Sequence, residues 1–196
     1  MIRPTRRAEG FTLIEVMMAL AVLTVGALGI MSLQGASTRG NVSGRRITAA
    51  TQRTNDWIER ARRDALYWTA PGDPVATAAG SRYLGEVGGG WFVPQSGVPT
   101  ETAGATWDGR DVPVGAADGA VHYCTHMQLN WVIPNQSIRV DVRTYWPRER
   151  GETPELVTDE CALGVEDTVS VDLTSAAPDL SAVHASTLLR WTPEAP

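Results

Sequence analysis

The chain has 196 residues, of which 43% are hydrophobic, and a formal net charge of −5. This length and composition suit one domain with a hydrophobic core plus an appendage, and they exclude a wholly disordered polymer. Residues 39–64 contain seven arginines and three acids, whereas residues 69–196 contain seven arginines and seventeen acids. Because an acidic surface repels phosphate backbones, we expect no nucleic acid to bind to the later part of the chain.

Residues 11–33, FTLIEVMMALAVLTVGALGIMSL, carry a single charge, that of Glu15. A helix of this length reaches roughly 35 Å, which spans a bilayer core of about 30 Å. The apolar run is too long for an ordinary signal peptide, although ALGIMSLQGAS imitates a cleavage site. Since Arg3, Arg6 and Arg7 precede the run, the positive-inside rule places the N-terminus in the cytoplasm and the later residues outside. The sequence therefore predicts one transmembrane helix.

Residues 34–68 lose hydrophobic density but keep a helical spacing of small and apolar residues. This pattern predicts an amphipathic continuation of the helix, with the arginines mostly on its other faces. Gly35, Gly40 and Gly44 each cost up to about 1 kcal/mol relative to alanine inside a helix, so the sequence allows a break or bend there. The predicted apolar stripe consists of Ile47, Ala50, Thr54, Ile58, Ala61, Ala65 and Trp68.

Residues 69–119 are rich in Gly, Pro, Thr and Ala. Structureless loops of this length are uncommon in compact domains, so we expect partial order in this segment. Its large aromatic residues, Trp91, Phe92 and Trp107, are expected to dock on the core of the domain.

The spacing of apolar residues changes to an alternating pattern after residue 119, which predicts three or four antiparallel strands. An apolar sheet face must be covered, and the stripe of the long helix is the candidate to cover it. The predicted fold class is therefore α+β, with a long N-terminal helix packed on a small antiparallel sheet. The expected strands are 120–134, 137–147, 167–173 and 186–191, with a hairpin turn at 134–136. The expected segments are a leader (1–10), a transmembrane helix (11–33), an amphipathic helix (34–68), a Gly/Pro-rich loop (69–119) and a β-sheet head (120–196).

The chain contains two cysteines, Cys124 and Cys161. Both lie in the part predicted to be exported, where an oxidising compartment favours a disulfide. Closing this loop would stabilise the fold by roughly 3 to 4 kcal/mol in the chain-entropy model. A zinc site is the alternative, because His122, Cys124 and His126 alternate along a predicted strand and Cys161 could supply a fourth ligand. We favour the disulfide, since two exported cysteines prefer each other, and predict no metal.

A short basic leader ends at Gly10, and residues 11–15, FTLIE, begin the apolar run. This combination resembles the class III leader of type IV pilins and the related pseudopilins. The resemblance implies that a membrane prepilin peptidase cuts after Gly10 on the cytoplasmic side and methylates the new amine of Phe11. It also implies that the apolar helix stays attached to the rest of the chain after cleavage.

Glu15 is costly in this place, since a charge at the bilayer centre costs at least about 2.5 kcal/mol. Cleavage would create an ammonium at Phe11, with an unperturbed pKa near 8. Glu15 could neutralise it within its own chain or on a neighbouring subunit of a filament, and so select an axial register. Alternatively, Glu15 interacts with the helix dipole and the lipid headgroups, and Thr12 could hydrogen-bond the helix start.

Residues 15–34 resemble more specifically the PilV type of minor pilin, with E-V-x-x-A-L, then V-L-x-x-G-x-L-G and Leu-Gln. The strand-like RVDVRTYWP also resembles that group, and the apolar run lacks the proline found in many major pilins. Gly26 and Gly29 could mark a close helix contact or a point where the helix loosens. A GspI-like minor pseudopilin of a type II secretion system is the alternative; the long Gly/Pro-rich loop favours the pilus.

The resemblance implies a protein of the inner membrane with a periplasmic head, which later becomes part of the pilus. The implied role is a priming or tip complex that initiates pilus assembly. The implied partners are the prepilin peptidase, other minor pilins, the major pilin, a tip adhesin, the inner-membrane assembly platform and inner-membrane lipid.

No enzyme motif is present: the chain lacks a phosphate-binding glycine motif, G-x-S-x-G and H-E-x-x-H. His184 has no obvious catalytic companion, and Asp108, Asp111 and Asp118 lack the spacing of a calcium loop. We therefore predict no catalytic residue and no cofactor. A membrane-anchored hydrolase or metal-binding protein is a remote alternative.

Overall fold

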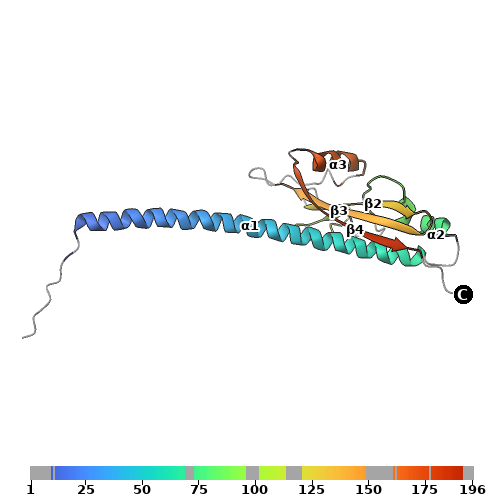
Figure 1. The fold of residues 1–196 in the computed structure, drawn as a ribbon, viewed down its shortest axis with the longest axis horizontal. Helices are drawn as coiled ribbons and strands as arrows, with labels where there is room; N and C mark the ends of the chain where they lie inside the picture. Colours follow the sequence, from blue (N-terminus) through green and yellow to red (C-terminus); the bar gives the residue numbers. More distant parts are fainter. Residues whose placement is uncertain are drawn as a thin grey trace, which may run out of the picture. The chain divides into compact units, whose positions relative to one another are not determined.

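The computed structural model describes residues 10, 12–68, 73–95, 102–113, 121–148, 161, 163–176 and 178–191. The chain divides into two compact units, Met1–Arg45 and Arg46–Pro196, which are described separately. A long helix, α1 (Leu13–Trp68), and a four-stranded sheet dominate the structure (Figure 1), so the predicted α+β fold is confirmed. The other elements are α2 (Pro74–Gly80), the 3-10 helix η1 (Leu84–Glu86), β1 (Gly104–Ala105), β2 (Tyr123–Ile133), β3 (Ser137–Pro147), α3 (Glu166–Thr174) and β4 (Leu180–Arg190).

The first unit contains residues 13–45 of α1, whose side chains are all exposed. The helix continues through Gly35, Gly40 and Gly44, so the break that the sequence allowed there is absent. Thr24 is accommodated in the apolar run because its hydroxyl donates a hydrogen bond of 2.8 Å to the carbonyl of Ala21.

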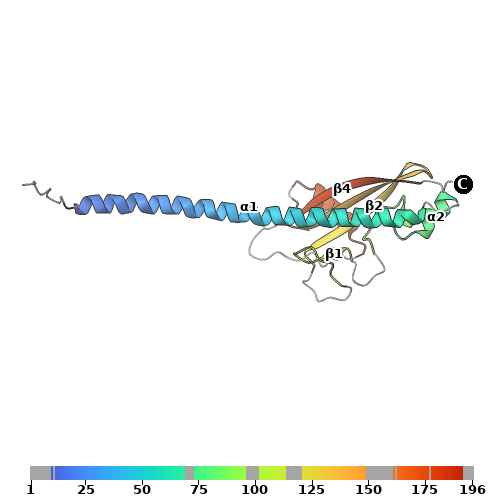
Figure 2. The same cartoon turned by 90° about the horizontal axis from the view of Figure 1, so that it is seen from below.

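Residues 46–68 of α1 belong to the second unit and cover one face of the sheet (Figure 2). Most of the predicted stripe is buried, but Ile47 is 48% exposed. Arg53 and Trp57, which were not assigned to the stripe, are buried. The main core consists of Trp57, Ile58, Ala61 and Trp68 from α1, Ala78, Tyr83 and Leu84 from the α2–η1 region, and Met127, Leu129, Ile138, Val140, Val142 and Leu189 from the sheet.

Arg53 is buried because it has partners far away in the sequence. Its guanidinium forms an ion pair with Asp111 and donates a hydrogen bond to the carbonyl of Thr102. Arg60 pairs with the other carboxylate oxygen of Asp111 at 2.9 Å. The two guanidinium groups lie 5.6 and 4.5 Å from the ring centroid of Trp57. These contacts fasten the described loop around Asp111 to α1, which the helical pattern alone could not reveal.

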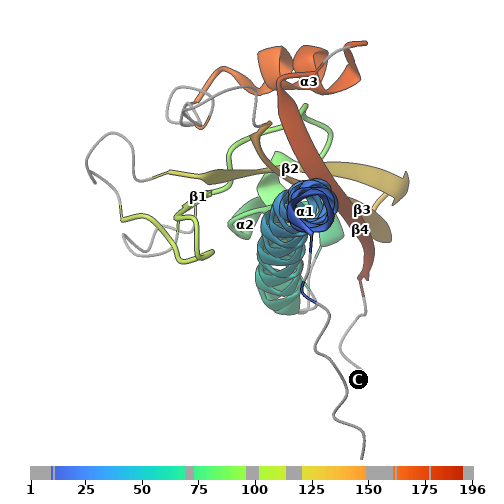
Figure 3. The ribbon, with the colours of Figure 1, turned by 90° about the vertical axis from the view of Figure 1, so that its left-hand side faces the viewer.

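All neighbouring strands of the sheet are antiparallel, in the order β1-β2-β3-β4. The predicted β2–β3 hairpin is confirmed, and Asn135 in its turn has a φ of 62°. Asparagine tolerates this left-handed conformation because its short polar side chain can bond locally. Figures 1 and 3 show α3 on the face of the sheet opposite to residues 46–68 of α1, so the second unit has three layers.

Two strand predictions need correction, and one short strand was not predicted. Residues 167–173, predicted as a strand, lie in α3. Glu166 and Asp167 stand in its first turn, where acids favour a helix, and the hydroxyl of Ser170 donates to the carbonyl of Glu166. The last strand begins at Leu180, earlier than expected, since small residues weakened its apolar alternation. The two-residue β1 was not predicted because it is too short to show a pattern.

In the described residues of the Gly/Pro-rich segment, 73–95 and 102–113, the expected order is found as α2, η1 and β1. Asp73 caps α2, because its carboxylate accepts a hydrogen bond of 2.9 Å from the backbone N–H of Val75. Phe92 exchanges two backbone hydrogen bonds of 2.9 Å with Met127 and packs against the core. Trp107 is 72% exposed, so its predicted docking is wrong.

Candidate functional site

The predicted processing site lies at the start of α1. The backbone N–H groups of Glu15 and Val16 donate to the carbonyl of Thr12 at 3.1 and 3.2 Å. The same N–H of Glu15 also lies 3.4 Å from the hydroxyl of Thr12, which accepts its hydrogen bond. Thr12 therefore caps the helix, as the sequence allowed. Gly10 is exposed, whereas Phe11 lies outside the described residues, so its methylation stays a prediction.

Thr12 and Glu15 have the spacing of a capping box, S/T-x-x-E/Q, a signal that the sequence reasoning did not use. Glu15 stands in the first turn of α1, where the helix dipole favours a carboxylate. Its side chain is exposed. This position suits a local role at the helix start, and it also leaves the carboxylate free to meet an ammonium on the same or another chain.

The first turns of α1 present a continuous apolar surface. Among the large hydrophobic residues from Leu13 to Leu33, the exposed fraction runs from 48% at Val16 to 81% at Leu13. Within the described residues, α1 is long and apolar enough to cross a membrane, by length and composition. A Cβ atom added at Gly26 or Gly29 would meet nothing within 4 Å. An apolar surface of this size must be covered by lipid or by other protein.

The structure contains the predicted disulfide between Cys124 and Cys161, with Cα atoms 5.5 Å apart. Cys124 is completely buried and packs in a second core cluster with Tyr145, Val169 and Leu180. The bond ties the segment before α3 to β2, across 37 residues of sequence.

The disulfide excludes the zinc site considered from the sequence, because both sulfur atoms are bonded to each other. His126 is also engaged, with a hydrogen bond at each ring nitrogen. In the described part of the chain, no group of three or more His, Cys, Asp or Glu side chains could hold a metal ion.

Replacing Cys124 and Cys161 together with alanine should lower the free energy of unfolding by about 3 kcal/mol, since the unfolded chain regains the entropy of an open loop. Unfolding can be followed by tryptophan fluorescence, because all 7 tryptophans lie in the second unit. Reducing agent should destabilise the wild-type protein by a similar amount and leave the double variant unchanged. A double variant as stable as the oxidised wild type would contradict the prediction.

A buried polar cluster joins β2, β3 and α3. The guanidinium of Arg143 donates hydrogen bonds to Nδ1 of His126 at 2.9 Å, to the hydroxyl of Ser170 at 2.8 Å and to the carbonyl of Glu166 at 2.8 Å. Arginine can only donate, so Nδ1 accepts and the proton of His126 sits on Nε2. Nε2 then donates to the hydroxyl of Tyr145, 2.9 Å away. The sequence reasoning missed this cluster, although His126 and Arg143 lie opposite each other in the strand pairing.

The charges in this cluster follow from its burial. Burial and the neighbouring Arg143 lower the pKa of His126 from 6.5 to about 3, so the ring is neutral. Burial also lowers the pKa of Arg143 to about 10, which leaves it protonated at neutral pH. Its charge lies 4.2 Å from the ring centroid of Trp91, which in turn contacts His184. His126 is 0% exposed and Arg143 2% exposed, so the cluster fastens α3 to the sheet and offers no access to a substrate.

The second unit should lose stability in mild acid. Because the pKa of His126 is about 3 when folded and 6.5 as a free side chain, unfolding takes up a proton between these values. The contribution of neutral His126 to the free energy of unfolding is fully present above pH 6.5 and is lost as the pH falls from 6.5 toward 3. Between about pH 7.5 and about pH 5.5 the expected loss is about 1.4 kcal/mol from this residue. His184, whose pKa burial also lowers, adds to it in the same direction.

Chemical denaturation of the wild type and of His126→Gln at these two pH values checks this prediction. The variant is expected to be less stable at neutral pH but to show a smaller loss of stability in acid. Equal pH dependence in both proteins would contradict the assignment to His126.

Comparison with known protein families gives a match in the N-terminal part of the chain. The profile of the family described as prokaryotic N-terminal methylation motif matches residues 5–31, which include Gly10, Phe11 and Glu15. No significant match was found among curated proteins or among solved structures. Proteins with this motif are generally structural rather than enzymatic, and the motif with its apolar helix indicates membrane anchoring. The chain therefore carries the class III leader of type IV pilin-like proteins, a group that includes the pseudopilins.

Proposed function

We propose that the protein is a minor pilin of a type IV pilus. The observation that carries the proposal is the overlap of two features: the methylation motif of residues 5–31 includes most of the exposed apolar part of α1, Leu13 to Leu33. Prepilin peptidase cuts after Gly10 and methylates the amine of Phe11. Cleavage at this point removes the basic leader and keeps the apolar helix, which first anchors the protein in the inner membrane with its N-terminus in the cytoplasm.

The same helix then serves assembly. When the apolar part of α1 moves from lipid into the core of a filament, its side chains stay in apolar surroundings. Burial from water therefore contributes little, and the packing between helices determines how the subunits associate. The amine of Phe11 is the charge that Glu15 neutralises, on its own chain or on the next subunit. An unpaired buried charge costs several kcal/mol, so this pairing selects one axial register among many similar apolar contacts.

The PilV-like pattern of residues 15–34, together with the absence of proline there, supports a minor rather than a major subunit. In this role the protein joins other minor pilins in a complex on the inner-membrane assembly platform. The complex primes polymerisation of the major pilin, remains at the pilus tip and can display an adhesin there.

Deletion of the gene, followed by shearing of surface pili and a type II secretion assay on the same cells, tests the proposal. Loss of surface pili with secretion intact supports the minor pilin. Normal pili with lost secretion would assign the protein to the GspI-like pseudopilins instead. Reintroduction of the wild-type gene, which must restore the lost property, is the control.

A further inference from the structure

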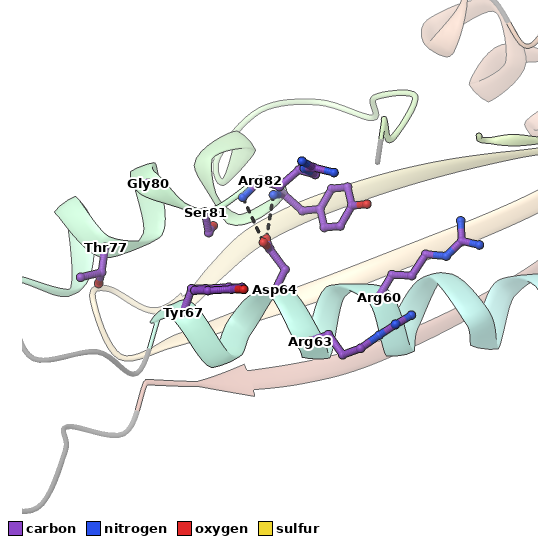
Figure 4. Close-up of a pocket in the computed structure, with 9 residues that line it drawn as sticks. Arg60, Arg63, Asp64, Tyr67, Thr77, Gly80, Ser81 and Arg82 are labelled. Atoms are coloured by element: carbon purple, nitrogen blue, oxygen red, sulfur yellow. Dashed lines mark hydrogen bonds between the residues drawn. The ribbon is translucent and has the colours of Figure 1, made fainter. Parts of the chain in front are cut away.

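A groove of about 730 Å³ lies in the second unit, between the last turns of α1 and the chain around α2 and η1 (Figure 4). Arg60 and Arg63 reach it from α1, and Arg82 reaches it from the segment between α2 and η1. Tyr67 and Tyr83 supply aromatic surface beside these arginines. Neither the methylation motif nor the disulfide involves this groove.

The groove has an excess of positive charge. Asp64 is the one acidic side chain among the described residues that line it. Both of its carboxylate oxygens accept backbone hydrogen bonds, from Arg82 at 3.0 Å and from Tyr83 at 2.8 Å. Asp64 therefore holds the wall of the groove in place.

Two of the three arginines retain hydrogen-bond donors that a ligand can reach. Arg60 is not one of them, because Asp111 holds it at 2.9 Å, Trp57 stacks against it and its Nη1 is buried. Arg63 and Arg82 are exposed, and no ion pair joins either of them to another part of the described chain. The groove is thus lined by one fixed arginine and two exposed ones.

We propose that this groove binds an acidic peptide segment of a partner protein. The planar fork of a guanidinium matches a carboxylate, and Arg63 and Arg82 can each take one, while the fixed charge of Arg60 adds to the attraction. Tyr67, 74% exposed, can cover the apolar side chains that separate the acids of a peptide.

The surroundings favour a short acidic segment over a long polyanion. Residues 69–196 contain seven arginines and seventeen acids, so the net charge of this part of the chain disfavours a long polyanion. A peptide needs the positive charge only within the groove. This inference concerns binding by the second unit and does not rest on the proposed function.

Fluorescence anisotropy with the full-length protein in detergent tests the proposal. The probe is a labelled peptide in which glutamates alternate with leucine and alanine, and its partner has glutamine in place of each glutamate. Wild-type protein should bind the first peptide and not the second. Arg63→Gln combined with Arg82→Gln should weaken binding about tenfold, because two exposed ion pairs with the peptide are lost.

Arg110→Gln combined with Arg190→Gln removes the same charge from exposed positions outside the groove and should change binding less than about twofold. Arg63→Glu with Arg82→Glu should reverse the preference toward a lysine peptide. Equal losses in the groove variant and the control would overturn the proposal, as would equal binding of both peptides. Stronger binding of an oligonucleotide than of the acidic peptide would also overturn it. None of these measurements involves filaments. A negative result would therefore overturn peptide binding by the groove without affecting the minor-pilin proposal, which the gene deletion tests.

Discussion

Glu15→Ala is expected to leave cleavage after Gly10 intact and to reduce incorporation into sheared filaments by at least about tenfold. In the proposed filament, the variant leaves the amine of Phe11 without its carboxylate in a region of low dielectric, and an unpaired buried charge costs several kcal/mol. Immunoblots of membrane and filament fractions measure incorporation, and mass spectrometry of the N-terminus measures cleavage and methylation.

Two further variants separate charge from helix capping. Glu15→Gln keeps the size and polarity of the side chain but not its charge, and it should fail like Glu15→Ala. Glu9→Ala removes an acid from the leader, which cleavage discards, and it should incorporate normally. Normal incorporation of Glu15→Gln would show that Glu15 serves the helix start and not an ion pair.

Arg143→Ala is expected to lower the free energy of unfolding of the second unit by about 3 kcal/mol or more. The variant removes three hydrogen bonds and leaves Nδ1 of His126 and the carbonyl of Glu166 with one donor fewer in a buried place. It also opens a cavity beneath α3 and removes the charge beside Trp91. Denaturation followed by tryptophan fluorescence measures the loss.

Arg139→Ala is the matched control, because Arg139 and Arg143 lie on the same face of β3. Arg139 is 58% exposed and pairs with Asp141 at the surface, so its loss should cost no more than about 0.5 kcal/mol. Equal destabilisation by the two variants would mean that the cluster at Arg143 does not hold α3.

Local patterns predicted the features that depend on neighbouring residues. The apolar run and the spacing from Gly10 to Glu15 indicated the long apolar helix and the methylation motif, because each signal lies within a few turns of one helix. Alternation predicted the β2–β3 hairpin, whose strands are joined by a short turn. The same pattern of alternating apolar and polar residues gave a wrong prediction for α3. Acids in its first turn and its hydrogen bonds with Arg143 favour a helix there.

The sequence by itself thus determined the methylation motif, the long apolar helix, the hairpin and the pairing of the two cysteines, since the chain contains no third cysteine. Only the tertiary structure decided which arginine side chains are buried and which residues they pair with. Arg53 and Arg143 resemble surface residues in sequence, yet both are buried, because Asp111 and His126 meet them after folding. Burying a guanidinium is favourable only when such partners are in place, and their position depends on the packing of the whole sheet against α1 and α3.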